Sequence, residues 1–259
     1  MGVVNVTPDS FSDGGRHFET RSAIDHGLAL AADGADLVDV GGESTRPGAD
    51  RVDAIEEARR VVPVVRELAA AGVRVSIDTM RRETAEAALA AGAIMVNDVS
   101  GGAADPGLPR LVAEAAVPYV VMHWRGHSAD MQERAEYVDV VGEVCAELSQ
   151  RLDAVVAAGV NPEQVVLDPG IGFAKTVEHN LALLARLEVL HELGCPIVVG
   201  ASRKSFLGKL TGRPVDDREL ATAAADTAAI LHGAQIVRVH DVAAQLPAVQ
   251  IADAVRCAG

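Results

Sequence analysis

Short apolar runs alternate with longer stretches of helical periodicity along the whole chain. Eight runs end in polar, charged or glycine residues and are expected to form strands. They are Gly2–Val6, Leu37–Val40, Val73–Ile77, Ile94–Val96, Tyr119–Met122, Val165–Leu167, Ile197–Val199 and Ile236–Val239. Strands that alternate with helices predict a parallel sheet, and eight such units in 259 residues predict an α/β fold, a closed (β/α)8 barrel.

Helical periodicity fills the intervals between these runs. The expected helices are Ser22–Asp33, Val52–Ala71, Arg82–Ala91, Leu108–Ala116, Tyr137–Ala158, Val177–Leu193, Glu219–His232 and Ala243–Cys257. Six of the intervals contain a glycine suited to a left-handed helix end, namely Gly34, Gly72, Gly92, Gly159, Gly194 and Gly233. The rhythm has no linker or low-complexity break, so we expect one domain over residues 1–259.

Composition narrows the class of protein. The chain is 49% hydrophobic but only 3% aromatic, which is typical of a core of aliphatic residues on buried parallel strands. Its formal net charge of −14, with no dense basic patch, argues against nucleic acid as a partner. The basic residues Arg203, Lys204, Arg238 and His240 nevertheless gather at two neighbouring strand ends, which indicates a small anionic ligand.

The cysteines and the N-terminal sequence indicate in which cellular compartment the protein is expected. Cys145, Cys195 and Cys257 lie far apart in no metal-binding spacing, so no disulfide framework is expected. The chain has no secretory leader pattern and no apolar run of the roughly 18 residues that a membrane helix needs. A cytoplasmic protein is expected. The first strand is short, which leaves open a longer native N-terminus.

Three polar residues end three different predicted strands. Asp78, Asn97 and Asp168 should converge, because the carboxyl ends of barrel strands meet on one face. Carboxylates accept hydrogen bonds and an amide both donates and accepts them, so together they suit a flat heterocycle such as a pterin. The alternative is that each Asp merely caps the following helix.

A second group follows the seventh and eighth predicted strands, where barrels often bind phosphate. It comprises Ser202–Ser205 and Arg238–His240, and strand alternation places Arg238 and His240 on the same side. Arginine donates two parallel hydrogen bonds to phosphate, and histidine can add a third. The alternative is a salt bridge inside the barrel with a neighbouring Asp. Lys204 is suited to contact a ring or its carbonyl group.

Loops that follow the strands carry further candidates. Thr7–Thr20 and Glu43–Arg51 are long and rich in Gly, Ser, Asp and Pro, which favours a functional role. Asn5 can offer its amide oxygen to a hard cation. Phe173 lies in a glycine-flanked loop and is expected to be a stacking surface. His123 is expected to pack or to form a pocket wall, and Arg125–Glu136 is assigned no role.

Seven of these segments together resemble the dihydropteroate synthase family over the whole chain. They are NVTPDSFSDGG at Asn5–Gly15, GGESTRPG at Gly41–Gly48, SIDT at Ser76–Thr79, VNDVSG at Val96–Gly101, DPGIGFAKT at Asp168–Thr176, GASRKS at Gly200–Ser205 and RVHD at Arg238–Asp241. The resemblance implies an alkyl transferase of folate biosynthesis, a sulfonamide target. It condenses 6-hydroxymethyl-7,8-dihydropterin pyrophosphate with 4-aminobenzoate, giving 7,8-dihydropteroate and pyrophosphate.

The resemblance also implies roles for residues at matching positions. Pterin would be held by Asp78, Asn97, Met122, Asp168 and Lys204, and pyrophosphate by Asn5, Arg238 and His240. Asn5 would also hold Mg2+, the expected cofactor. The aminobenzoate would be surrounded by Thr45, Arg46, Pro47, Phe173 and Ser205. Catalysis would rest on Asp168, Lys204, Arg238, His240 and Asp9, the last in a mobile loop with Thr7, Pro8 and Asp13. Members of the family are expected to be homodimers.

Two other functions remain as alternatives. A pterin-binding methyltransferase of the methyltetrahydrofolate type shares the Asp and Asn pattern but needs no pyrophosphate ligands, so Arg203, Lys204, Arg238 and His240 argue against it. The second alternative is a barrel that binds pterin without catalysis. Such a barrel would not need to keep the phosphate-facing residues, whereas this chain has all of them. Pterin binding without pyrophosphate release would distinguish that alternative from the synthase.

Overall fold

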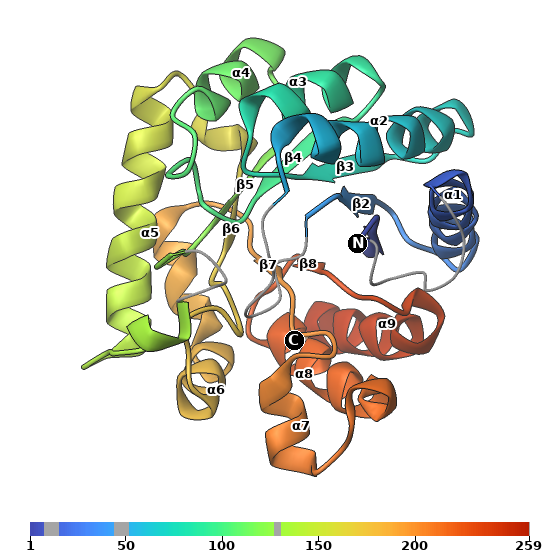
Figure 1. Cartoon of the computed structure of the whole chain (residues 1–259). Helices are drawn as coiled ribbons and strands as arrows, with labels where there is room; N and C mark the ends of the chain where they lie inside the picture. The colour runs from blue at the N-terminus through green and yellow to red at the C-terminus, as the bar shows by residue number, and fades with distance from the viewer. Residues whose placement is uncertain (8–15, 44–51, 127–130, 259) are drawn as a thin grey trace.

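A ring of parallel strands surrounded by helices forms the centre of the molecule (Figure 1). The computed structural model describes residues 1–7, 16–43, 52–126 and 131–258. The strands are β1 (Gly2–Asn5), β2 (Val38–Gly41), β3 (Val75–Asp78), β4 (Met95–Asp98), β5 (Tyr119–Met122), β6 (Val165–Asp168), β7 (Val198–Val199) and β8 (Ile236–Val237). The bounds of β5 are those predicted, and the ends of the other strands lie within two residues of the predicted ends.

Two sheets and two bridges close this ring. Strands β1 to β6 pair in sequence order as one parallel sheet, and β7 pairs with β8. Single parallel bridges join Leu167 to Ile197 and Gly2 to Val239, so each open edge meets the other sheet. The predicted (β/α)8 barrel is therefore confirmed. Ile197 and Val239, predicted as strand residues, contribute only these bridges, which is why β7 and β8 are short.

The helices pack around the outside of the barrel (Figure 1). They are α1 (Arg16–Ala32), α2 (Ala54–Ala70), α3 (Arg82–Ala90), α4 (Leu108–Ala115), α5 (Val140–Ala157), α6 (Val177–Ala185), α7 (Ser205–Thr211), α8 (Glu219–Leu231) and α9 (Val242–Ala258). Short 3-10 turns lie at Met131–Arg134, Pro162–Gln164, Leu187–Leu193 and Val215–Asp217. The six predicted glycines at helix ends all have positive φ, from 74° at Gly194 to 113° at Gly92.

Two helix predictions need correction, in addition to the start of α1, which lies at Arg16 rather than Ser22 and so inside the predicted loop Thr7–Thr20. Val177–Leu193 is not one helix, because Arg186 leaves the helical region with φ −133° and ψ 35° and a 3-10 turn follows it. Helix α7 was not predicted, since its seven residues are too few to show helical periodicity. Both differences lie beside strands whose positions were predicted, so the order of units around the barrel is unchanged.

Strand alternation separates an apolar layer from a polar layer inside the barrel. Met95, Val120, Val166 and Val198 come from four neighbouring strands and form one buried cluster. Two residues further along the same strands come Asn97, Met122, Asp168 and Gly200. Side chains two residues apart on a strand face the same side. The apolar layer therefore fills the amino-terminal part of the barrel, and polar side chains gather at the carboxyl ends.

Among the helices that the structure describes, none combines the length and the apolar character needed to span a bilayer.

Candidate active site

The polar strand ends line one pocket at the carboxyl face of the barrel. Asp78 and Asn97 are register partners on β3 and β4, and Met122 and Asp168 are partners on β5 and β6. The pocket is lined by Asp78, Asn97, Val99, Met122, Asp168, Ile171, Phe173, Gly200, Ser202, Lys204, Arg238 and His240. The three polar residues predicted to converge do so, and the two predicted constellations form one site.

Asp39, on β2, lies at the centre of this site and was not predicted. Its side chain is fully buried, with 0% exposure. The Oδ2 atom accepts hydrogen bonds from Asn97 Nδ2 at 2.9 Å and from Arg238 Nε at 2.7 Å. Because the amide nitrogen of Asn97 donates to Asp39, the orientation of that amide is fixed. The sequence signal was a single carboxylate inside the apolar run Leu37–Val40.

Arg238 forms the salt bridges that the sequence analysis gave as the alternative to phosphate binding. Its Nη2 donates to Asp78 Oδ2 at 2.8 Å, in addition to the contact with Asp39. Burial raises the pKa of Asp78 to about 7, against the opposing charge of Arg238. The guanidinium thus already balances two carboxylates, the fully buried Asp39 and the partly exposed Asp78. Since arginine carries five N–H donors, these two bonds leave further donors for an anion.

Lys204 and Phe173 form the side of the pocket next to β6 and β7. The ammonium of Lys204 lies 4.0 Å from the centroid of the Phe173 ring, which is a cation–π contact. Burial lowers the pKa of Lys204 to about 8, while the charge of Asp168 raises it. Burial likewise raises the pKa of Asp168, whose Oδ1 accepts from Gly170 N at 2.7 Å. Phe173 and Trp124 pack against the buried residues Met80, Val99 and Met122.

The remaining basic residues divide between the pocket and the surface. His240 lines the pocket, and its Nδ1 lies 3.0 Å from Ser202 Oγ. Arg203, grouped with them as a candidate anion ligand, instead donates from Nε to Glu219 on α8 at 2.7 Å. Its backbone is in the left-handed region, with φ 58°. Arg203 therefore pairs with a helix and, among the described residues, does not belong to the pocket lining.

Other predicted site residues lie at the edge of the pocket or outside the described part of the chain. Asn5 ends β1 in register with Gly41, and Ser205 is the exposed first residue of α7. Within the described residues, neither belongs to the pocket lining. Thr7 is buried. Pro8, Asp9, Asp13, Thr45, Arg46 and Pro47 fall outside the described residues.

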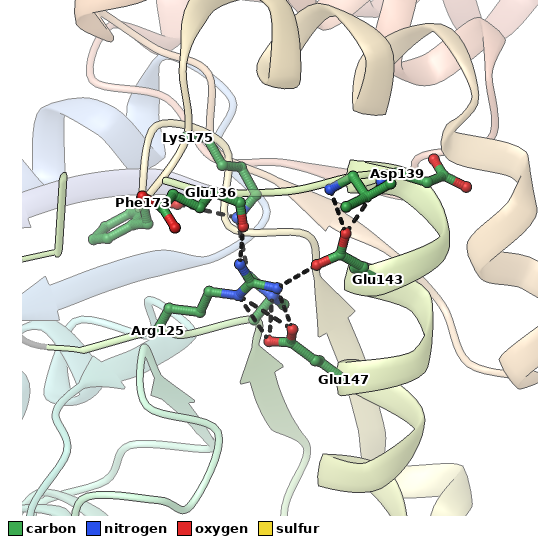
Figure 2. Close-up of polar contacts among 9 residues, drawn as sticks. Arg125, Glu136, Asp139, Glu143, Glu147, Phe173 and Lys175 are labelled. Carbon is green, nitrogen blue, oxygen red and sulfur yellow. Dashed lines mark hydrogen bonds and ion pairs between the residues drawn. The ribbon is translucent and has the colours of Figure 1, made fainter. Parts of the chain in front are cut away.

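A buried polar network behind Phe173 was also missed by the sequence analysis (Figure 2). Lys175 Nζ lies 2.9 Å from His123 Nδ1, and His123 Nε2 lies 3.0 Å from Glu147 Oε2 on α5. His123 is therefore a hydrogen-bonded residue of the barrel wall and, among the described residues, does not line the pocket. Its partners are 24 and 52 residues away along the chain, so sequence spacing gave no signal.

No group of three or more His, Cys, Asp or Glu side chains within the described residues is placed to hold a metal ion. Asn5 remains a single oxygen donor at the end of β1. Such a donor set fits a magnesium ion that is bound mostly by substrate phosphate and water, and it does not fit an ion held by protein ligands alone.

Comparison with known proteins places the chain among pterin-binding enzymes. The family model described as "Pterin binding enzyme" matches residues 1–240. Dihydropteroate synthase of Mycobacterium leprae is 56% identical over 98% of this chain and 92% of the relative. The synthase of Synechocystis is 45% identical over 98% of this chain and 89% of the relative.

Solved structures agree with this placement. Dihydropteroate synthase of Xanthomonas albilineans with 4-aminobenzoic acid has a TM-score of 0.93 and 47% identity, over 99% of this chain and 92% of that one. The same enzyme in complex with 7,8-dihydropteroate has a TM-score of 0.89 and 44% identity, over the same shares of the two chains, 99% and 92%.

Proposed function

The chain belongs to the pterin-binding enzyme family, and we propose that it acts as a dihydropteroate synthase. It condenses 6-hydroxymethyl-7,8-dihydropterin pyrophosphate with 4-aminobenzoate to give 7,8-dihydropteroate and pyrophosphate. The observation that carries the proposal is the single pocket in which Asp78, Asn97 and Asp168 lie beside Lys204 and Arg238. In this pocket, the carboxylates and the oriented amide can form hydrogen bonds to a heterocycle, and the basic side chains can bind an anion.

Recognition of the pterin rests on fixed hydrogen-bond acceptors. Asp168 is held by the backbone of Gly170, and Asn97 is oriented by Asp39, so both present their remaining groups without rearrangement. A pterin edge offers several N–H donors to such acceptors. Met122 and Val99 supply apolar contact beside the ring. The pocket therefore favours a flat, donor-rich heterocycle over a purely apolar ring.

Charge stabilisation assists departure of the pyrophosphate. The bond between the exocyclic CH2 of the pterin and the pyrophosphate oxygen breaks, and the electron pair leaves with pyrophosphate. Arg238 and His240 stabilise the departing charge, and Asp168 stabilises the positive charge that develops on the pterin. The amine of aminobenzoate then forms the new C–N bond and loses a proton. In this mechanism the protein positions the reactants and excludes water, which would otherwise attack the same carbon.

Magnesium is part of the proposal as a cofactor. When bound with pyrophosphate, the ion would supply positive charge that stabilises the phosphate oxygens and the leaving group. Asn5 is the protein oxygen we assign to it, with the substrate and water completing the coordination. Removing divalent ions with a chelator should abolish turnover, and added Mg2+ should restore it.

Residues outside the described part of the chain complete the assignment. Asp9 is assigned to catalysis, and Thr45, Arg46 and Pro47 are assigned to aminobenzoate with Phe173 and Ser205. These assignments follow from the family positions alone.

Pyrophosphate release separates this function from the two alternatives. A methyltetrahydrofolate-type methyltransferase or a non-catalytic barrel would bind a pterin but would release no pyrophosphate. The synthase should release pyrophosphate from the pterin substrate when 4-aminobenzoate is present and should form dihydropteroate in equal amount. The chain is similar to named synthases over nearly its full length, which favours this outcome.

We further propose a cytoplasmic homodimer of single-domain subunits. Its three cysteines, Cys145, Cys195 and Cys257, are all free thiols, which suits a reducing compartment. Large apolar side chains are exposed on the last three helices, including Leu210 on α7, Leu220 on α8 and Ile251 on α9. These helices pack side by side (Figure 1). Sedimentation equilibrium of the whole chain tests the dimer, and a monomeric mass would exclude it.

A further inference from the structure

Lys175 is a buried lysine that does not touch the pocket yet contacts a residue that does. Its side chain is 5% exposed, and burial lowers the pKa of its amine to about 7. Burying an ammonium group costs free energy unless polar partners compensate it. One partner is the backbone carbonyl of Phe173, which accepts from Lys175 Nζ at 3.0 Å. The chain between them turns through Ala174, with φ 47°. The amine therefore folds back and holds the backbone of Phe173.

The second partner, His123, is held in one tautomer by Glu147. Burial lowers the pKa of His123 to about 4, so the ring is neutral near pH 7. The Glu147 carboxylate can only accept, hence the proton of the ring is on Nε2, which donates to it at 3.0 Å. The lone pair of Nδ1 is then free to accept from Lys175 Nζ at 2.9 Å. Glu147 thus determines which hydrogen bond His123 offers to Lys175.

Arg125 fixes Glu147 in turn (Figure 2). Its guanidinium bonds both carboxylate oxygens of Glu147, Glu143 Oε2 at 2.9 Å and the carbonyl of Glu136 at 2.6 Å. It also lies over the Tyr137 ring, 3.8 Å from the centroid. A continuous set of contacts therefore runs from α5 through Arg125, Glu147, His123 and Lys175 to the loop after β6.

Phe173 is the point at which this network reaches the pocket. Its ring contacts Lys204 and packs near Met122, while its carbonyl is held by Lys175. Two lysines thus contact Phe173: Lys204 contacts its ring, and Lys175 donates to its backbone carbonyl. A shift of the backbone would move the ring relative to any aromatic substrate beside it.

We propose that Lys175, with His123 and Glu147, is a positioning residue for the arylamine substrate. The network fixes Phe173 and thereby determines the affinity for 4-aminobenzoate, although among the described residues none of its members belongs to the pocket lining. This inference rests on the proposed function, because Phe173 is assigned there to the aminobenzoate side of the site.

The first test compares Lys175→Met with Lys209→Met. The two substitutions are chemically the same, but Lys209 is exposed on α7. Lys175→Met should raise the KM for 4-aminobenzoate about tenfold, the loss expected when the hydrogen bonds that hold Phe173 in place are removed. Lys209→Met should leave the KM for 4-aminobenzoate and the KM for the pterin substrate unchanged. The dissociation constant of a pterin lacking pyrophosphate, measured by titration, should change much less than the KM for aminobenzoate.

The second test is cleaner, because Lys175 also lowers the pKa of Asp168 through its charge. It compares Glu147→Gln with Glu143→Gln. Both glutamates accept from Arg125, but only Glu147 contacts His123. The amide introduced by Glu147→Gln can donate to Nε2 of His123 and so place the ring proton on Nδ1, against Lys175. This substitution should therefore raise the KM for aminobenzoate several-fold. Glu143→Gln weakens the start of α5 and one contact of Arg125, but it leaves the contact between Glu147 and His123 in place. It should lower Tm and leave that KM unchanged.

The outcomes separate this inference from the proposed function. Wild-type protein that makes no dihydropteroate would reject the function itself. If the wild type is active but neither Glu147→Gln nor Lys175→Met changes the KM for aminobenzoate, the positioning role is overturned. It is also overturned if these variants change the KM for aminobenzoate and the affinity for pterin equally. If Lys175→Met fails to fold, Glu147→Gln alone decides.

Discussion

Asp168 and Arg238 lie in the same pocket but have different physical tasks. Asp168 is held by a backbone N–H and lines the pocket, whereas Arg238 is held by the carboxylates of Asp39 and Asp78. The first is suited to accept hydrogen bonds from a pterin. Arg238 stabilises the charges of two carboxylates in the folded state, and we also propose that it binds the anion. Its substitution therefore requires two measurements, one of stability and one of ligand affinity.

Asp168→Asn should weaken pterin binding at least tenfold, about 1.4 kcal/mol. The substitution keeps the shape but replaces an acceptor with a donor, which faces the donors of the ligand and leaves them unpaired. Titration with a pterin that lacks pyrophosphate measures the effect. Asp216→Asn, at an exposed position, is the matched control. An unchanged dissociation constant for Asp168→Asn would contradict the pterin assignment.

Arg238→Ala should weaken the pyrophosphate-bearing substrate far more than a pterin without that group. It should also lower Tm, because Asp39 and Asp78 lose their common counter-charge in a buried site. Binding of both ligands and thermal unfolding are measured together. A lowered Tm with equal loss of affinity for the two ligands would mean that Arg238 is structural only.

At the scale of elements, strand alternation explains why so much of the site was predictable. Asp78, Asn97 and Asp168 each end an apolar run, and a barrel brings such ends together whatever the loops do. Asp39 escaped because it lies inside a strand, where sequence alone does not show which side it faces. Lys175 and His123 escaped because their contact joins two different loops. The contact between Arg203 and Glu219 on α8 could not be predicted, because it depends on a left-handed backbone at Arg203.

The loop between β6 and α6 illustrates how backbone geometry supports the site. Gly170 has φ 69°, and a Cβ there would lie 2.5 Å from the carbonyl oxygen of His123. Gly170→Ala should therefore displace the loop that carries Phe173 and reduce turnover strongly. Gly72→Ala also has positive φ, 82°, but a Cβ there meets nothing within 4 Å. It should cost only about 1 kcal/mol of stability and leave kcat unchanged.

Steady-state kinetics and thermal unfolding of the two glycine variants check this contrast. Equal activity of Gly170→Ala and Gly72→Ala would show that the close approach of this loop to β5 has no part in turnover.

For the stability of the molecule as a whole, Asp226 on α8 is unfavourable, because its ionised carboxylate destabilises the folded state. Its side chain is 0% exposed, and neither carboxylate oxygen has a hydrogen-bond partner in the described part of the chain. Burial raises its pKa to about 8. A carboxyl group whose pKa is higher in the folded state destabilises that state when it ionises. The penalty is absent below the unfolded pKa, near 4, and grows as pH rises to about 8.

Asp226→Ala should therefore stabilise the protein more at pH 9 than at pH 5. The upper bound on the growth is about 1.4 kcal/mol for each pH unit between the two pKa values. Chemical denaturation of both proteins across this pH range measures it, with Asp216→Ala as the exposed control. A stability difference that does not depend on pH would show that Asp226 is compensated in solution.

The most direct measurement is pyrophosphate release from 6-hydroxymethyl-7,8-dihydropterin pyrophosphate with Mg2+, in the presence and absence of 4-aminobenzoate. A dihydropteroate synthase should release pyrophosphate only when aminobenzoate is present and should form dihydropteroate in equal amount. Pterin binding without release, or release that ignores aminobenzoate, would contradict the claim that this pocket joins the two substrates.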